Sequence, residues 1–339
     1  MKHVHLYFHG NCLDGAVSAA FFTLFFRENV ISNAVFSYFP MTHIPNFSWK
    51  NVDLNGDVNV VLDFRYAPDF RLHWFFDHHG TSFMTPEHRR HFENRMEMPP
   101  HFFWDPAAPS NTSFMVHSLQ KHYGYQLNDV QEKLVKWVDM IDSACFPTPD
   151  IPVELVEPAV AFARLLENSL DTTETERFIH DVVAGHTLDE MAQTPYWSNR
   201  LNRIRQANWN EVEDVKNTLE NHTGVVFIDL SEKERTGFNK FIPYYLSPDA
   251  LYSVALLLYH NRYKVSVGTN PWHKWRNAEP VLDIGALAET FGGGGHCAVG
   301  AVSFERTQKE KAAAAAREIF NACRKNIDAI KLEQAKKNL

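Results

Sequence analysis

Short apolar segments and one apolar helix alternate along the first third of the chain, and polar residues collect where the apolar segments end. Strands are predicted at residues 4–8, 33–39, 59–62 and 72–76, and a helix begins just after Asp14 and Gly15. A short apolar run bounded by polar residues is typical of a buried strand. Strands separated by helices and loops predict a mainly parallel α/β sheet, in which ligands bind beyond the carboxyl ends of the strands.

The pattern becomes helical from about residue 110 to residue 221 and then returns to α/β. The helical part begins with SNTS at 110–113, which is typical of a helix N-cap. As an alternative, the same hydroxyl and N–H groups would bind a phosphate. Later strands are predicted at 223–228, 252–259, 263–268 and 297–304, a helix at 282–291, and a terminal helix from Lys309. The 339 residues and the change of pattern near residue 222 together predict two domains.

Composition and charge exclude several classes of protein. A formal net charge of −8 argues against a protein whose main task is to coat long nucleic acid. The four cysteines are far apart and form no CxxC pair, so neither a disulfide scaffold nor a zinc ribbon is indicated. Neither a signal peptide nor an apolar run of membrane-spanning length is recognisable, so a cytoplasmic location is expected.

Four groups of acidic or imidazole side chains lie where the pattern places strand ends or helices. They are His9 with Asp14, Asp63 alone, Asp77 with His78 and His79, and Asp139 with Asp142. A single aspartate after a strand is usually a cap, but a triple of Asp and two His directly after the apolar run Trp74–Phe76 is hard to explain by packing. Oxygen and imidazole ligands without thiolates favour manganese, magnesium or iron. The number of ligands suffices for two ions that share a carboxylate, an arrangement suited to phosphoryl displacement.

Five segments, in order, resemble the motifs of the DHH phosphoesterase superfamily, which includes nanoRNase and RecJ-like enzymes. FHGNCLDGAVSA at 8–19, LDF at 62–64, FFDHHGTS at 75–82 and VDMIDSA at 138–144 resemble its four catalytic motifs. GALAETFGGGGHCAVGAV at 285–302 resembles the glycine-rich motif of the DHH-associated C-terminal domain. The resemblance implies a site for two divalent ions, with manganese expected and magnesium as the alternative. Its implied metal ligands are His9, Asp14, Asp63, Asp77, His78 and Asp142, with Asp139 as the alternative to Asp142.

The resemblance also implies roles within this site. Asp63 would bridge the two ions, and His78 would bind one of them, with Asp77 orienting it or ligating. His79 would face the scissile phosphate, so that Asp77, His78 and His79 form the implied catalytic group. In the second domain, Gly293, Gly294, Gly295 and His296 would let a phosphate or base approach the main chain, with a tight turn as the alternative.

The chain departs from the family pattern at two places. The first motif usually carries Asp-x-Asp, and Cys12 stands at the first of these positions. Either Cys12 ligates as a thiolate, or Asn11 binds weakly, or one ion is held more loosely; otherwise Cys12 is a small core residue. In the second domain, Gly268 and Thr269 replace an Arg-Ser pair, so substrate phosphate would meet Asn270, His273 or Arg276 instead.

We therefore expect a parallel-sheet DHH catalytic domain over residues 1–222, a smaller α/β substrate-binding domain over 223–306, and a helical tail over 307–339. The active site is expected in the cleft between the two domains. The expected activity is metal-dependent hydrolysis of short oligonucleotides or dinucleotides to mononucleotides. A pyrophosphate or polyphosphate hydrolase and a nucleotide-binding module with a degenerate site are the alternatives. A short nucleic acid is the expected partner, no membrane partner is expected, and a dimer stays open.

Overall fold

The computed structural model describes residues 1–44, 47–95, 101–169, 171–278 and 281–337, and the chain forms two compact units. The first unit consists of Met1–Cys145 and Val156–Ile204, and the second consists of Phe146–Leu155 and Arg205–Leu339. The division therefore differs from the predicted limits. The second unit takes residues 205–222 and the short segment 146–155 from the predicted catalytic domain, and it includes the predicted tail.

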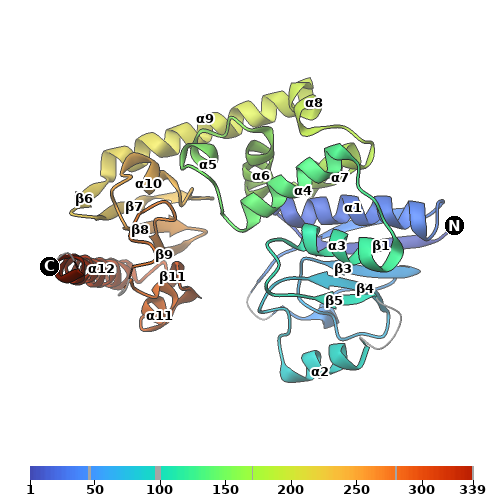
Figure 1. The fold of residues 1–339 in the computed structure, drawn as a ribbon, viewed down its shortest axis with the longest axis horizontal. Helices are drawn as coiled ribbons and strands as arrows, with labels where there is room; N and C mark the ends of the chain where they lie inside the picture. Colours follow the sequence, from blue (N-terminus) through green and yellow to red (C-terminus); the bar gives the residue numbers. More distant parts are fainter. Residues whose placement is uncertain (45–46, 96–100, 170, 279–280, 338–339) are drawn as a thin grey trace. The chain divides into compact units, whose positions relative to one another are not determined.

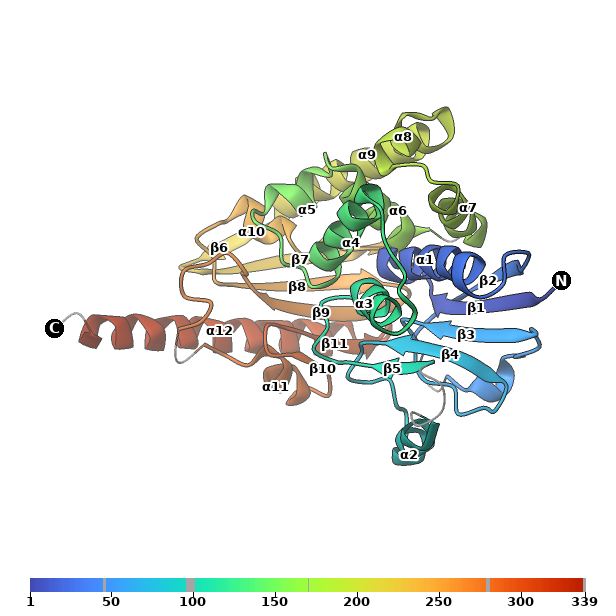
Figure 2. The ribbon, with the colours of Figure 1, turned by 45° about the vertical axis from the view of Figure 1, so that its right-hand side comes forward.

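The first unit is built on a five-stranded sheet with the order β2-β1-β3-β4-β5, in which all neighbouring strands are parallel (Figure 2). Its strands are β1 (His3–His9), β2 (Val35–Met41), β3 (Val58–Leu62), β4 (Leu72–Asp77) and β5 (Phe102–Trp104). The predicted parallel α/β sheet is confirmed. The strand β5 was not predicted: its sequence FFW is too short to stand out, and it forms because Phe75 and Phe76 of β4 offer it a paired edge.

Aromatic side chains fill both faces of this sheet. On one face, Phe22 of α1 (Leu13–Asn29) packs against Trp74 and Phe76, with ring centroids 5.4 and 6.3 Å apart. On the other face, Tyr7 and Phe75 belong to a second buried cluster. The remaining helices of this unit are the 3-10 turn η1 (Trp49–Asn51), α2 (Pro86–Arg95), α3 (Asn111–Tyr123), α4 (Asp129–Asp142), α6 (Pro158–Asn168), α7 (Thr172–Val183) and α8 (Leu188–Gln193). Helix α9 (Pro195–Thr218) contributes residues to both units.

The second unit is built on a mixed six-stranded sheet with the order β10-β11-β9-β8-β7-β6 (Figure 1). Its elements are α5 (Asp150–Glu154), β6 (Glu220–His222), β7 (Val225–Arg235), α10 (Ile242–Leu246), β8 (Tyr252–Tyr259), β9 (Arg262–Thr269), α11 (Ile284–Glu289), β10 (Gly294–His296), β11 (Val299–Glu305) and α12 (Lys309–Lys337). Among the described strand pairs of this sheet, β7 and β8 run parallel and the others antiparallel.

Both faces of the second sheet are covered by helices. Ala312, Ala316 and Ile319 of α12 pack in one buried cluster with the β8 residues Val254 and Leu256. On the other face, Val212 and Val215 of α9 pack with Ile228 and Leu257. Helix α12 is therefore a core element of this unit rather than a separate tail. None of the helices in the described part of the chain is long and apolar enough to cross a membrane.

Candidate metal centre

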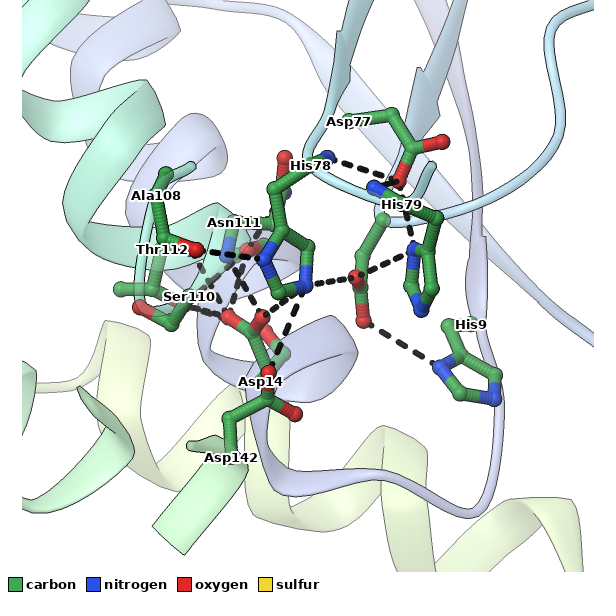
Figure 3. Close-up of polar contacts among 12 residues, drawn as sticks. His9, Asp14, Asp77, His78, His79, Ala108, Ser110, Asn111, Thr112 and Asp142 are labelled. Atoms are coloured by element: carbon green, nitrogen blue, oxygen red, sulfur yellow. Dashed lines mark hydrogen bonds and ion pairs between the residues drawn. The ribbon is translucent and has the colours of Figure 1, made fainter. Parts of the chain in front are cut away.

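Residues from three motifs meet at the carboxyl edge of the first sheet. His9 ends β1, Asp63 follows β3, and Asp77 ends β4. These strands are neighbours and parallel, so their carboxyl ends lie side by side. Asp14 comes from the first turn of α1, and Asp142 is the last residue of α4. Figure 3 shows the side chains of Asp14 and Asp142 next to the ring of His78, with Asp77 next to His79.

Asp63 lies in the middle of the cluster. Its φ of 55° is in the left-handed region, where Asp is one of the few residues tolerated, and this turns its carboxylate toward the neighbouring strand ends. Its Oδ2 lies 3.3 Å from His9 Nδ1, and its Oδ1 lies 3.5 Å from His78 Nε2 and 3.6 Å from His79 Nδ1. Oδ1 is buried and has no hydrogen-bond partner among the described residues.

His78 directs one ring nitrogen at three carboxylates. Its Nδ1 lies 3.1 Å from the carbonyl oxygen of Ala108, which fixes a proton on Nδ1 because the carbonyl can only accept. The opposite nitrogen, Nε2, lies 3.7 Å from Asp14, 3.5 Å from Asp63 and 3.4 Å from Asp142. This nitrogen is also buried, and no described residue forms a hydrogen bond with it.

Asp14 is held by the start of α3. Its carboxylate accepts the backbone N–H groups of Asn111 and Thr112 at 2.7 and 2.8 Å and the Thr112 hydroxyl at 2.6 Å. Ser110 caps the same helix by accepting from the N–H of Ser113 at 3.1 Å. SNTS therefore forms an N-cap, as the first of the two interpretations predicted. In addition, two of its backbone N–H groups donate hydrogen bonds to Asp14.

The two aspartates of the fourth motif have different partners. Asp139 accepts a hydrogen bond from the Ser110 hydroxyl at 2.6 Å and so braces the start of α3. Asp142, one turn further along α4, faces His78. Of the two, Asp142 is the residue that can complete a metal site.

Asp77 orients His79 rather than His78. Its Oδ1 accepts a 2.7 Å hydrogen bond from Nδ1 of His79 and a 2.9 Å bond from the backbone N–H of His78. Its Oδ2 accepts from the Ser82 hydroxyl. Asp77 is fully buried, and both of its carboxylate oxygens have hydrogen-bond partners. It was expected to bind a metal ion or to orient the ring of His78, but the ring that it contacts is that of His79. It leaves Nε2 of His79 pointing away from the strand.

The charges in the cluster perturb one another strongly. Burial disfavours the protonated form of His78, but Asp63 and Asp14 outweigh it and raise its pKa to about 10. For His79, burial acts likewise, but Asp77 and Asp63 raise the pKa to about 9. Burial and then the charge of Asp63 raise the pKa of Asp142 to about 6.

The other two carboxyl groups shift in opposite directions. Burial, followed by the charges of Asp63 and Asp142, raises the pKa of Asp14 well above its usual range. Burial acts in the same direction on Asp63, but His78 and His9 outweigh it and hold the pKa of Asp63 below its usual range. Asp63 is therefore negatively charged, and the imidazole rings of His9, His78 and His79 contact its carboxylate.

The replaced position of the first motif has a definite structure. Asn11 donates its side-chain amide N–H groups to the carbonyl oxygens of Leu166 and Ser169, so its amide nitrogen holds the end of α6. Cys12 precedes α1, and its sulfur lies within 4.8 Å of ligand atoms of His9 and Asp63. Burial and the charge of Asp63 raise the pKa of the Cys12 thiol well above its usual range, so a thiolate forms there only if a cation displaces the proton.

Sequence reasoning missed one member of the cluster, His43. It follows β2 in the loop after Met41, and its ring centroid lies 4.7 Å from that of His9 and 5.6 Å from that of His79. Burial, followed by His9 and His79, lowers the pKa of His43 to about 4. The only signal that could have found it is its position just after the strand that pairs with β1.

The predicted substrate-binding residues of the second unit make structural contacts. Asn270 is 1% exposed, donates its amide to the carbonyl oxygens of Pro248 and Ala250, and accepts from the N–H of Trp272. Asn270 therefore holds the turn after β9, and its side chain is already engaged where a substrate contact was predicted. His296 ends β10 and is exposed.

The glycine run is largely explained by the sheet. Gly292 has a φ of 79°, and a Cβ on Gly293 or Gly295 would lie 2.2 Å from a carbonyl oxygen of β11. Gly294 has neither constraint, since a Cβ there would meet open space. The turn alternative thus accounts for Gly292, and close approach to β11 accounts for Gly293 and Gly295.

The cluster fits divalent ions. Within the described residues, four groups bring ligand atoms within 4.8 Å of one another: Asp14, His78 and Asp142; Asp63, His78 and His79; His9, Cys12 and Asp63; and His9, His43 and His79. Buried polar atoms without partners call for an explanation, and a cation bound by Asp63 Oδ1 and His78 Nε2 supplies one. Asp63 and His78 each belong to two of these groups; Asp63 has two carboxylate oxygens and could serve two adjacent ions, whereas His78 offers only Nε2 and could hold one of them.

Comparison with solved structures identifies the fold. The pGpG-specific phosphodiesterase PggH from Vibrio cholerae matches with a TM-score of 0.66 and 20% identity, over 95% of this chain and 99% of that one. A DHH domain described as a member of a family of ribosomal proteins matches at 0.53 and 11%, over 94% and 86%. RecJ with Mn²⁺ from Thermus thermophilus matches at 0.50 and 11%, over 95% of this chain and 52% of that one. No family model and no curated protein sequence matches this chain.

These matches show the fold of DHH-domain proteins, a parallel-sheet unit followed by a smaller α/β unit. The chain has the fold of the DHH phosphoesterase superfamily, as the sequence motifs predicted.

Proposed function

We propose that the protein is a metal-dependent phosphodiesterase that hydrolyses short linear dinucleotides or oligonucleotides to mononucleotides. The observation that carries this proposal is the pair of buried atoms Asp63 Oδ1 and His78 Nε2, which have no hydrogen-bond partner in the described part of the chain. They lie 3.5 Å apart between two further sets of ligands. Two divalent ions bound there would activate a water molecule and neutralise charge on a phosphoryl group in an in-line displacement. Manganese is the expected metal, with magnesium as the alternative.

The protein's own side chains would prepare this chemistry by their fixed orientations. Ala108 keeps the proton of neutral His78 on Nδ1, which leaves Nε2 free to bind a cation. The start of α3 holds Asp14 in the rotamer that faces His78. Fixed ligands lower the reorganisation that metal binding requires.

His79 is the side chain suited to the substrate. It is the more exposed of the two adjacent imidazoles, at 32% against 11% for His78. With its Nδ1–H donated to Asp77, its Nε2 is available to meet a phosphate oxygen. In the metal-free protein, the effect of burial is outweighed by Asp77 and Asp63, which raise its pKa to about 9, so that there it is protonated at neutral pH and can donate a hydrogen bond to an anionic oxygen.

Two observations support a short substrate. The net charge of −8 disfavours a long polyanion, so binding must depend on local positive charge at the site. PggH, which aligns over nearly the whole of both chains, is described as specific for pGpG, whereas this chain covers only about half of RecJ from Thermus thermophilus. A linear dinucleotide is therefore the first substrate to test.

The proposal is tested with Mn²⁺ and a panel comprising pGpG, a 5′-phosphorylated five-mer RNA, a cyclic dinucleotide, 3′-phosphoadenosine 5′-phosphate and pyrophosphate. We expect mononucleotide release from the linear substrates and its loss in Asp63→Asn. The matched control is Asp328→Asn, at an exposed position of α12. Hydrolysis of pyrophosphate alone would replace the proposal by the phosphoanhydride alternative, and nucleotide binding without turnover would replace it by the binding module.

A further inference from the structure

We propose that His43 is a metal-binding residue, which supplies an imidazole ligand beside His9, in the part of the centre where Cys12 replaces the expected aspartate. The role of the ion in catalysis rests on the proposed function, whereas the set of ligands rests on the geometry of the site. The centre divides into two parts. The carboxylate set is Asp14, His78 and Asp142, and the imidazole set is His9 and His43, with His79 beside it as the imidazole that faces the substrate.

Strand pairing brings His43 to the centre. β2 runs parallel to β1 with Met41 opposite His9, and the N–H of Gly10 donates to the carbonyl oxygen of Met41 at 2.8 Å. A residue two positions beyond Met41 therefore leaves the sheet beside His9. One nitrogen of His43 lies within 4.8 Å of a nitrogen of His9, a spacing that a single ion bound by both requires, and a nitrogen of His79 lies within the same distance of each.

The ring of His43 is held by packing. It stacks on Phe64, with ring centroids 4.4 Å apart and an interplanar angle of 25°, and Phe64 directly follows Asp63 in the chain. Its Nε2 is buried and has no hydrogen-bond partner among the residues that the structure describes. A buried nitrogen without a partner is costly, and a bound ion removes that cost.

The chemistry of the imidazole set differs from that of the carboxylate set. Carboxylate oxygens suit magnesium and manganese, whereas imidazole nitrogens suit later first-row ions such as iron, cobalt and zinc. Cys12 strengthens the difference, because its sulfur lies in the same part of the centre as His9. We therefore infer that the ion on the His9 side is a transition-metal ion and that Mg²⁺ alone fills this side poorly.

The test is a Co²⁺ titration of the full chain without substrate, followed by calorimetry and by the visible absorption of the bound ion. The variant His43→Phe keeps a ring to stack on Phe64 but has no nitrogen. Its matched control is His88→Phe. His88 on α2 also has a buried ring nitrogen without a partner among the described residues, but it belongs to none of the ligand groups found there.

We expect wild type and His88→Phe to bind two Co²⁺ ions per chain. In His43→Phe, the affinity for one of the two Co²⁺ ions should fall at least about tenfold, and the visible spectrum of the bound Co²⁺ should change. A fall of about tenfold is the lower limit because it is already typical when a residue that only supports a metal ligand is removed. If His43→Phe does not fold in EDTA, as judged by circular dichroism, His43→Asn takes its place.

Two ions bound to His43→Phe with wild-type affinity and spectrum would overturn the inference. A raised KM with unchanged Co²⁺ binding would overturn it as well, by making His43 a substrate contact. Because no substrate is present in the titration, failure of the proposed function is a separate result. A protein that binds Co²⁺ through His43 but hydrolyses no phosphodiester refutes the function and supports the ligand.

Discussion

Two segments were predicted to be functional, and the structure treats them differently. At the carboxyl edge of the first sheet, Asp63 and His78 keep buried atoms without partners in the described part of the chain. In the second unit, Gly293 and Gly295 make close contacts with β11, and the side chain of Asn270 makes three hydrogen bonds. Polar groups that a fold has already satisfied are structural, whereas those it leaves unsatisfied at a cost mark a place for a ligand.

The largest effect should follow from Asp63→Asn. Asn tolerates the left-handed backbone conformation of this position and has nearly the same volume, so folding should be retained. The loss of its charge removes the group shared between ligand sets, and metal catalysis supplies several kcal/mol. We expect at least about a 1,000-fold fall in phosphodiesterase kcat/KM, with unchanged circular dichroism. Activity within about tenfold of wild type would remove Asp63 from the centre.

Asp14 and Asp142 should separate the structural and metal-binding roles within the carboxylate set. Asp14→Ala leaves two N–H groups and the Thr112 hydroxyl without their acceptor, which should lower the free energy of unfolding by about 1–3 kcal/mol. Asp142→Ala breaks no hydrogen bond of this kind among the described residues and should leave stability within about 0.5 kcal/mol. Urea denaturation in EDTA measures both. Equal stability of the two variants would contradict the role of Asp14 in holding α3.

The glycine run offers a matched pair of substitutions. Gly293→Ala places a Cβ 2.2 Å from the carbonyl oxygen of Ala301 and should cost about 1–3 kcal/mol of stability, whereas a Cβ on Gly294 meets nothing within 4 Å. Thermal melting of both variants should therefore lower the Tm for Gly293→Ala only. A stable Gly294→Ala with a raised KM for a dinucleotide would restore a binding role to this segment.

A further expected effect is the pH dependence of stability. The pKa values of His78 and His79 are raised to about 10 and about 9 in the folded protein, so their stabilising contribution is complete below about pH 6.5. It is lost as the pH rises toward 10. In EDTA, the Tm should therefore fall between about pH 7 and pH 10, and less steeply in His78→Gln.

Manganese should reverse this trend, because the ion must displace the proton from Nε2 of His78. The rise in Tm on adding Mn²⁺ should grow as the pH increases from about 6 to 8. A rise in Tm that is independent of pH would indicate that Mn²⁺ does not bind at His78.

The site residues were predictable to different degrees. His9, Asp63 and His78 follow strands whose apolar patterns are visible in the sequence, so parallel pairing brings them together. Asp14 was predicted from its motif, but its support by α3 depends on residues almost a hundred positions away. His43 could not be found, because a single histidine in a loop carries no pattern, and its role depends on the pairing of β2 with β1.

The sequence by itself determined the parallel sheet, the helical middle part, the second α/β unit and the order of the ligand-bearing motifs, because these depend on local apolar patterns and short motifs. Tertiary structure alone decided which oxygens and nitrogens are left without partners. In the folded chain, Asp77 is hydrogen-bonded to His79, and Asp139 is hydrogen-bonded to Ser110. Asn270 is hydrogen-bonded within the turn after β9, and His43 lies next to His9. The physical reason is that a polar side chain's role depends on which partners the fold brings within hydrogen-bonding reach, and those partners are distant in sequence.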